Sequence, residues 1–238
     1  MDSTNDLARR IVARWDRSRP FPGLVLRAGE QTAGRGRRGR SWSSPPGRGL
    51  YLSVVRALPR EGVVALPLLV GAAVCDVLTE RFGLEAGLEW PNDVVVAGRK
   101  IAGVLVEVVG AGGSSPIGIL GVGLNVSHRA SDLPRRDATS IEIETGRTVA
   151  TSELAVAVVA AVDGELREGA RPGYAVARFG ELTVHRPGDQ LACREGDHEV
   201  RGLFDGLDPS GALRLRVGDE VRIVHGGELG HDGEDVPC

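Results

Sequence analysis

Seven consecutive residues, 34–40, carry the strongest chemical signal in the sequence, because they combine four arginines with three glycines as Gly-Arg-Gly-Arg-Arg-Gly-Arg. Arginine presents planar, paired donors that suit phosphate and carboxylate groups. Glycine allows the backbone to turn sharply and to approach a ligand closely. The whole protein carries a formal net charge of -3, so this positive charge is local. The run therefore predicts a loop that binds an anion.

Three other interpretations of this run compete with anion binding. Gly34, Gly36 and Gly39 match the dinucleotide fingerprint G-x-G-x-x-G, which requires a helix directly after it. Residues 41–47 read Ser-Trp-Ser-Ser-Pro-Pro-Gly, which disfavours a long helix. Arginine- and glycine-rich nucleic-acid segments usually recur in disordered tails, whereas this run is single and lies between apolar segments. A solvated basic loop stays open as the third interpretation.

The composition limits the function classes that the chain can serve. Its 238 residues, 42% of them hydrophobic, fit one large domain, or a domain of about 180 residues with a smaller one. The three cysteines lie far apart and the five histidines are scattered, so the sequence carries neither a disulfide framework nor a zinc-ligand pattern. No apolar run reaches the length of a membrane span, and Met1 does not begin a signal peptide. We therefore expect a cytoplasmic protein.

The elements that would position the loop follow from hydrophobic spacing and from turn residues. We expect a helix that begins at Ser3, includes Trp15 and ends before Pro20, because its apolar residues recur at helical intervals. Further helices are expected over residues 65–82, 152–168 and 174–179. Strands are expected over residues 24–28, 50–55, 87–90, 94–97, 101–109 and 117–126. After residue 183, short apolar segments alternate with turn sequences, which is typical of a small antiparallel β unit.

The expected strand over residues 117–126 contains three glycines, at Gly118, Gly121 and Gly123. Glycine weakens a strand unless another group must approach the backbone closely. The pattern therefore predicts that this strand forms a floor beneath a ligand.

Five runs of residues, in this order and spacing, resemble the catalytic domain of biotin–protein ligases. They are Asp-Ser-Thr-Asn at 2–5, Gln-Thr-Ala-Gly-Arg-Gly-Arg-Arg-Gly-Arg-Ser-Trp at 31–42, Trp-Pro-Asn-Asp at 90–93, Arg-Lys-Ile-Ala-Gly at 99–103 and Gly-Val-Gly-Leu-Asn-Val at 121–126. Asp-Ala-Thr-Ser at 137–140 and Gly-Gly-Glu at 226–228 also resemble short segments of this family. Each run alone is weak, whereas the ordered set is specific and covers nearly the whole chain.

The resemblance implies an α+β fold. Residues 1–182 would form a catalytic domain with a mixed β-sheet and helices on one side, like the domains of class II aminoacyl-tRNA synthetases and biotin ligases. Residues 183–232 would form a small SH3-like β-barrel, and residues 233–238 a frayed tail.

The resemblance also implies an activity. The enzyme would activate biotin with ATP and Mg²⁺ as biotinyl-5'-AMP, and transfer it to a lysine of a biotin carboxyl carrier protein. Positioning and electrostatics would supply most of the catalysis, so no protein nucleophile is needed. We expect neither DNA nor a membrane as a partner, and the oligomeric state stays open between a monomer and a homodimer.

The family's site residues map onto this sequence by resemblance. Catalysis would involve Lys100, Arg37 and Asp93. Biotin would be bound by Ser3, Thr4, Asn5, Gln31, Gly34, Arg35, Arg37, Lys100 and Gly103. ATP would be bound by Arg35, Arg38, Arg40, Trp42, Asn92, Lys100 and Asn125, and the metal by Asp93 and Asn125. The cationic residues would hold a carboxylate and a polyphosphate together against their repulsion.

Several of these residues also have structural interpretations that the sequence leaves open. Ser3 can cap the first helix, and Asp93 can cap the turn that follows Pro91. Lys100 can be a solvated turn lysine, and Asn125 can be a turn or bulge residue.

Three features depart from the family pattern. Glu89 precedes the Trp-Pro-Asn-Asp run, where the family usually has a basic residue. Met1 stands directly before the Asp-Ser-Thr-Asn run, where relatives have more chain. The sequence shows no helix-turn-helix before that run, so we expect a monofunctional ligase and not one that also represses genes.

Three alternative functions remain: a lipoate ligase with the same adenylate chemistry, a nucleic-acid-binding module and an inactive relative that only holds biotin. The arginine loop and the Trp-Pro-Asn-Asp run favour biotin over lipoate. The acidic net charge disfavours nucleic acid.

Overall fold

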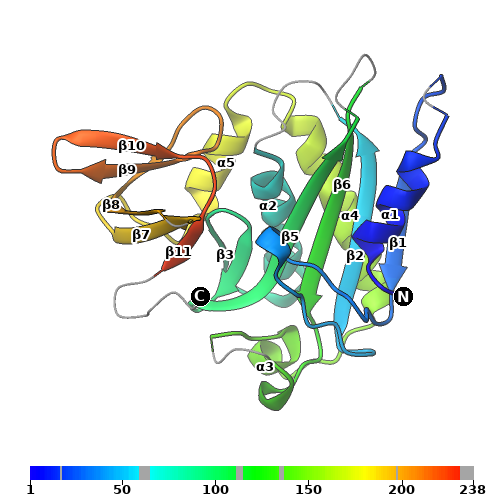
Figure 1. Ribbon diagram of the computed structural model, residues 1–238. Helices are drawn as coiled ribbons and strands as arrows, with labels where there is room; N and C mark the ends of the chain where they lie inside the picture. Colours follow the sequence, from blue (N-terminus) through cyan, green and yellow to red (C-terminus); the bar gives the residue numbers. More distant parts are fainter. Residues whose placement is uncertain (17, 59–64, 111–114, 134–136, 197, 231–238) are drawn as a thin grey trace.

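A six-stranded antiparallel sheet with helices on both faces forms most of the protein, in a computed structural model that describes residues 1–16, 18–58, 65–110, 115–133, 137–196 and 198–230 (Figure 1). The strand order is β1-β2-β6-β5-β4-β3. The strands are β1 (Leu24–Ala28), β2 (Gly49–Ala57), β3 (Ala86–Glu89), β4 (Asp93–Val96), β5 (Arg99–Val109) and β6 (Ile117–Asn125). The helices are α1 (Thr4–Ala13), α2 (Leu66–Phe82), α3 (Ile141–Thr145), α4 (Thr151–Glu168) and α5 (Tyr174–Leu182).

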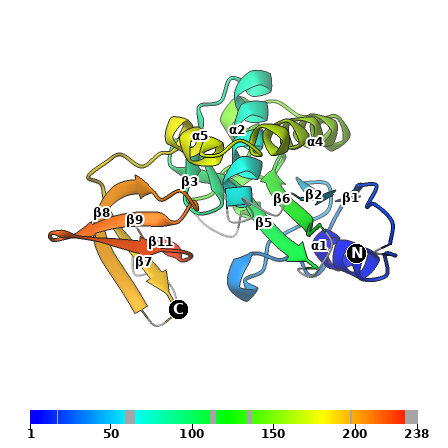
Figure 2. The ribbon, with the colours of Figure 1, turned by 90° about the horizontal axis from the view of Figure 1, so that it is seen from above.

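The two faces of this sheet are covered by different helices, because successive side chains of a strand point to opposite faces. Leu50, Leu52 and Val54 of β2 belong to the large core beneath α2 and α4. Val55 of the same strand packs in a separate cluster with α1 residues such as Ala8. Viewed from above, α2, α4 and α5 lie on one side of the sheet and α1 on the other (Figure 2).

Local sequence explains where α1 and α2 begin and end. The Ser3 hydroxyl accepts a hydrogen bond from the backbone N–H of Asp6, which caps α1. Pro67 lies in the first turn of α2, where a missing N–H costs nothing. Gly83 ends α2 in the left-handed conformation, with φ 68°. The capping interpretation of Ser3 is therefore confirmed, although α1 ends at Ala13, earlier than the sequence indicates.

A second antiparallel sheet follows α5 in the chain. Its strand order is β10-β9-β8-β7-β11. Its strands are β7 (Gln190–Glu195), β8 (His198–Leu207), β9 (Leu213–Val217), β10 (Glu220–Val224) and β11 (Glu228–Gly230). We call it the C-terminal sheet. The indole Nε1 of Trp90 donates to the carbonyl of Gly211 over 3.1 Å, which ties the large sheet to the C-terminal sheet.

The α+β class and the small C-terminal β unit agree with the expectation from sequence. Two details differ. All five strand pairings of the large sheet are antiparallel, so the sheet is not mixed. The helices are not confined to one side, because the apolar stripe of α1 covers Val55, Ile117 and Ile119 on the second face. The domain limits at 182 and 232 and the barrel topology stay predictions, and the tail 233–238 lies outside the described residues.

Candidate ligand-binding site

The arginine and glycine run forms a tight loop in front of the α1 face of the large sheet. The backbone N–H of Trp42 donates to the carbonyl of Gly34 over 2.9 Å, and that of Gly36 to Arg40 over 2.8 Å. A Cβ atom at Gly34 would lie 2.4 Å from the Trp42 carbonyl oxygen, so only glycine fits there. The next regular element is the strand β2 rather than a helix, so the dinucleotide-fingerprint interpretation is wrong.

Arg37 points from this loop toward the turn between β3 and β4. Its Nη1 donates to Oδ1 of Asn92 over 3.1 Å, while Nδ2 of Asn92 donates to the carbonyl of Val104 over 2.8 Å. The amide therefore has a fixed orientation and holds the guanidinium through a neutral acceptor. Burial lowers the pKa of Arg37, and the neighbouring charge of Arg38 adds to this effect. A desolvated cation that binds a neutral group is well suited to an incoming anion.

Arg38 and Arg40 contact the C-terminal sheet. Arg38 adopts φ 54° in the left-handed region and donates to the carbonyls of Arg194, over 3.0 Å, and Gly226, over 3.2 Å. Arg40 forms an ion pair with Glu228. Arg38 and Arg40 therefore fasten the loop to the C-terminal sheet. Both also lie near enough to Arg37 for their positive charges to help lower the pKa of its guanidinium.

Lys100 lies on the same face of the large sheet, between Asp93 and Trp42. Its Nζ donates to Oδ2 of Asp93 over 2.5 Å and lies 5.6 Å from the centroid of the Trp42 ring. Burial raises the pKa of Asp93, and the Lys100 ammonium opposes that shift. The other carboxylate oxygen, Oδ1, is buried and has no hydrogen-bond partner among the described residues. Lys100 is therefore a partly buried member of a charge pair rather than a freely solvated turn lysine.

The glycines beneath this site make room for protein side chains. A Cβ atom would lie 2.4 Å from the Trp42 ring at Gly123 and 3.0 Å from it at Gly103, and 2.6 Å from Asn5 at Gly121. Gly118 instead faces Leu58. Gly121 and Gly123 therefore make room for Asn5 and Trp42, whereas Gly118 lies on the opposite face, and a floor beneath a ligand stays a prediction.

A polar network joins the start of α1 to the large sheet. Thr4 is 4% exposed, and its backbone N–H donates to Oε1 of Gln31 over 2.9 Å. Nε2 of Gln31 donates to the Ser44 hydroxyl over 2.8 Å. The Ser53 hydroxyl donates to Oδ1 of Asn5 over 2.6 Å. Sequence reasoning missed Ser44 and Ser53, although Ser53 is a small polar residue within the largely apolar strand β2 and could have been found from that contrast.

Arg35 points into the same region as Asn5. Its Nη1 lies 3.0 Å from carboxylate oxygens of both Asp6 and Glu107. Neither acidic residue was expected in the site. Glu107 is a single carboxylate within the apolar run of β5, and that contrast is the sequence signal that could have identified it.

Metal ligands are sparse in this region. The described part of the chain contains no group of three or more His, Cys, Asp or Glu side chains that could hold a metal ion. Mg²⁺ needs only one or two protein carboxylates when substrate phosphates complete its coordination, and the unpartnered Oδ1 of Asp93 fits that requirement. Nδ2 of Asn125 donates to the carbonyl of Thr139 over 2.9 Å, which fixes the orientation of that amide at the end of β6.

The sequence matches the model of the biotin/lipoate A/B protein ligase family over residues 2–125. It is 34% identical to the biotin--[acetyl-CoA-carboxylase] ligase of Paracoccus denitrificans, over 96% of each chain. It is 33% identical to the protein of that name from Mycobacterium tuberculosis, over 96% of this chain and 85% of the relative. It is 32% identical to the bifunctional ligase/repressor BirA of Escherichia coli, over 84% of this chain, and spans 63% of that relative's length.

Solved structures resemble the whole chain. The Aquifex aeolicus biotin protein ligase in complex with biotin and ATP superposes with a TM-score of 0.75 at 26% identity, over 96% of this chain and 94% of that one. The Leishmania major biotin protein ligase with biotinyl-5-AMP gives a TM-score of 0.62 at 26% identity, over 93% and 94% of the two chains. Within the described residues of this protein, no helix combines the length and apolarity needed to cross a membrane.

Proposed function

The chain belongs to the biotin/lipoate A/B protein ligase family, and on that premise we propose that it is an ATP-dependent biotin–protein ligase. The observation that carries the proposal is the turn at Asn92 and Asp93, two adjacent residues that bind Arg37 and Lys100 respectively. A loop cation and a strand cation are thereby held at one place on the α1 face. Such an arrangement suits a carboxylate and a phosphate that must react with each other.

The reaction has two steps. A biotin carboxylate oxygen attacks the α-phosphorus of ATP, the bond to the bridging oxygen breaks, and pyrophosphate leaves. The acceptor lysine amine then attacks the acyl carbon of the mixed anhydride, loses a proton, and AMP leaves. In this scheme Arg37 and Lys100 stabilise the negative charge that grows on the phosphoryl oxygens. Both cations are already partly desolvated, which strengthens their interaction with that charge.

The start of α1 and the loop at Gln31, which it contacts, would bind biotin. Ser3, Thr4 and Gln31 would hydrogen-bond the ureido ring, with Asn5 beside them. The close contact between Thr4 and Gln31 supports this assignment, because it holds two of the donors and acceptors in place before the ligand arrives. Gly34, Arg35 and Gly103 would line the rest of the biotin site.

ATP would lie on the other side of Trp42, toward Asn125. Arg35, Asn92 and Lys100 complete the proposed ATP contacts, with Arg38 and Arg40 acting mainly by holding the loop closed over the polyphosphate. Mg²⁺ would be held by Asp93 and Asn125, and when bound it would neutralise charge on the phosphates. Asp93 is also the candidate to take the proton from the acceptor amine, because burial raises the pKa of its carboxyl.

The proposed acceptor is a lysine of a biotin carboxyl carrier domain, in keeping with the names of the two ligases that this chain matches over 96% of its length. The purified protein should be mixed with MgATP, biotin and such a carrier domain, and the carrier mass measured. A single gain of one biotinyl group that disappears without ATP is the expected result. Parallel reactions with lipoate test the sister activity, because the matched family model includes lipoate ligases.

Absence of both carrier modification and pyrophosphate release would overturn the proposed function. Modification by lipoate in place of biotin would redirect it to the sister activity. A solution mass measurement on the same sample decides between a monomer and a homodimer.

A further inference from the structure

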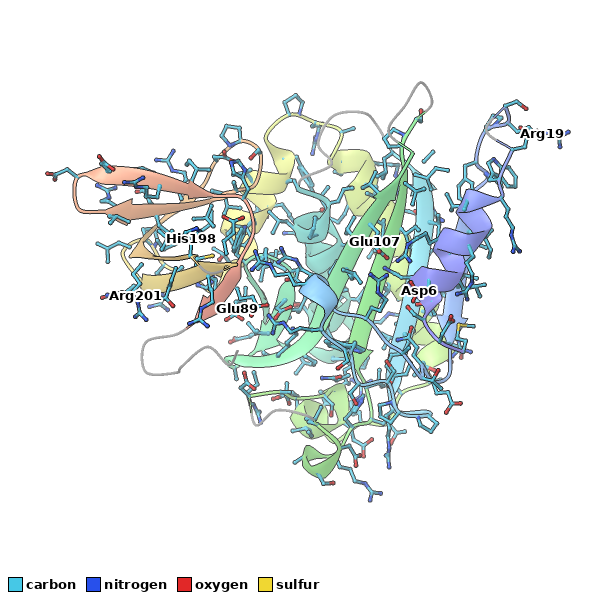
Figure 3. All side chains as sticks on the ribbon, in the orientation of Figure 1. Asp6, Arg19, Glu89, Glu107, His198 and Arg201 are labelled. Carbon is cyan, nitrogen blue, oxygen red and sulfur yellow. The ribbon has the colours of Figure 1, made fainter. Side chains whose placement is uncertain are left out.

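Four charged side chains form a closed network between α1, the arginine loop and β5. Arg9 donates to Asp6 over 2.8 Å and to Glu107 over 2.6 Å. Arg35 donates to the same oxygen of each carboxylate, over 3.0 Å in both cases. Asp6 and Glu107 lie close together between α1 and β5 (Figure 3). Two carboxylates and two guanidiniums balance in charge.

The network uses only one edge of the Arg35 guanidinium. Both of its ion pairs run through Nη1, whereas a guanidinium carries donors on Nη2 and Nε as well. The Arg35 side chain is 37% exposed and those of Asp6 and Glu107 are 23% and 21% exposed, so the arginine extends outward from a more buried acidic base. Such a contact fixes the plane of the guanidinium and leaves its other donors for a ligand.

Glu107 also fixes the start of α1. Its second oxygen, Oε2, accepts from Nδ2 of Asn5 over 3.0 Å, and the same nitrogen contacts the carbonyl of Leu105. One carboxylate of β5 therefore binds both the helix that carries the proposed biotin-ring contacts and Arg35, which lines the proposed biotin site.

We propose that Glu107, with Asp6, is a positioning residue that aims Arg35 at the carboxylate of the bound acid. This inference rests on the proposed function and adds a residue to it. It runs against simple charge reasoning, because removing a negative charge near the site would by itself favour an anionic ligand. The positioning role predicts the opposite sign, since Arg35 loses its defined orientation when Glu107 no longer binds it.

The test compares two ligands in the full-length protein. Calorimetry measures the binding of biotin and of its neutral carboxamide to wild type and to Glu107→Gln. Each titration contains an ATP analogue whose bond between the α- and β-phosphates cannot be cleaved, so the order of binding does not matter. We expect biotin to bind the variant about tenfold more weakly, with the carboxamide affinity unchanged within about twofold. The neutral ligand isolates the carboxylate contact from contacts to the biotin ring.

Asp163→Asn is the matched control. Asp163 on α4 binds Arg56 through two hydrogen bonds of 2.8 and 3.0 Å, with an exposure similar to the Glu107 pair, but on the opposite face of the sheet. Its substitution should leave both ligand affinities unchanged. Asp6→Asn should also weaken biotin and leave the carboxamide affinity unchanged, because Asp6 accepts from the same Nη1 of Arg35 over 3.0 Å.

Two results would overturn the inference. Equal weakening of biotin and carboxamide would show that Glu107 acts only through α1. Unchanged or tighter biotin binding would show that Glu107 does not orient Arg35 and acts on the ligand only through its negative charge. Failure of wild type to bind either ligand would instead count against the proposed function, so the two failures are distinguishable.

Discussion

The two faces of the large sheet are built from the same strands but carry different kinds of side chain. On the α2 and α4 face, Leu50, Leu52 and Val54 of β2 continue an apolar core. On the α1 face, the alternate residue Ser53 binds Asn5, and Tyr51 donates to the carbonyl of Pro45. The α1 face combines a small apolar cluster around Val55 with the buried charge of Asp93 and with glycines at positions 121 and 123 that make room for Asn5 and Trp42.

This difference separates stability from chemistry within a single sheet. Apolar packing needs no partner other than protein. Desolvated charges such as Arg37 and Asp93 cost free energy unless a ligand or a neighbouring charge compensates them, and they concentrate at functional sites for that reason. Substitutions in the core beneath α2 should therefore change stability, and substitutions around Arg37 and Asp93 should change binding and rate.

Lys100→Ala is expected to have the largest effect and to leave the α2 face intact. Loss of the ammonium should slow adenylation by about 10²–10³-fold, the usual cost of removing one stabilising group from a developing anion. Release of pyrophosphate from biotin and ATP, without a carrier, measures this step. The double variant Lys100→Ala/Asp93→Asn leaves no unpaired carboxylate but also loses a proposed Mg²⁺ ligand, so it should be at least as slow. A near-normal rate in both would remove Lys100 from the reaction.

Leu120→Ala tests the apolar face. Leu120 of β6 is fully buried beneath α2, so its truncation should lower the free energy of unfolding by about 3 kcal/mol. Urea denaturation measures this loss, and the folded variant should keep wild-type affinity for biotin. Val108→Ala, at a position 40% exposed on β5, is the control and should cost less than about 0.5 kcal/mol. A large change in biotin affinity for Leu120→Ala would contradict the separation of the two faces.

Two glycines of β6 compare the faces within one strand. A Cβ atom at Gly123 would lie 2.4 Å from the Trp42 ring, whereas one at Gly118 would lie 2.7 Å from a terminal methyl of Leu58 on the opposite face. Gly123→Ala should raise the KM for ATP about tenfold by displacing Trp42. Gly118→Ala should alter only the unfolding midpoint. Equal KM values for the two variants would mean that Trp42 does not contact the nucleotide.

The smallest expected effect concerns the pH dependence of stability at Asp93. Burial raises the pKa of its carboxyl above the ordinary value of 3.8, so its contribution to stability is present below that value. The contribution is lost as the pH rises through the raised, folded-state pKa. Wild type should therefore lose stability relative to Asp93→Asn as the pH rises above about 4, as urea denaturation at each pH would measure. A constant difference would mean that Lys100 cancels the effect of burial.

Most elements of the fold could be predicted from hydrophobic spacing. The strands over 101–109 and 117–126 and the helix over 65–82 agree with β5, β6 and α2 to within two residues. The short helix α3 was missed, although Ser140 caps it by accepting from the N–H of Ile143 over 3.2 Å. Five residues carry too little periodicity to indicate a helix.

The site was predictable as a set of residues, but the partner of each side chain was not. The ordered runs identified Arg37, Lys100, Asp93 and Trp42 together, and they lie on one face of the sheet. Glu107 stands out as the single acid in the apolar run of β5, but its partners Arg9 and Arg35 lie 98 and 72 positions away in the chain, so the sequence did not show that it belongs to the site.

The amino-acid sequence by itself indicated most of the helices and strands, the cationic character of the loop and the family resemblance, because these depend on local spacing and on residue type. Tertiary structure alone decided that the loop arginines bind different parts of the molecule. Arg35 binds Glu107 of β5, and Arg38 binds the C-terminal sheet. The partners of Arg35 and Arg38 lie 72 and 156 positions away in the chain. Only the strand register and the left-handed turn at Arg38 bring such groups together, and neither leaves a local pattern in the sequence.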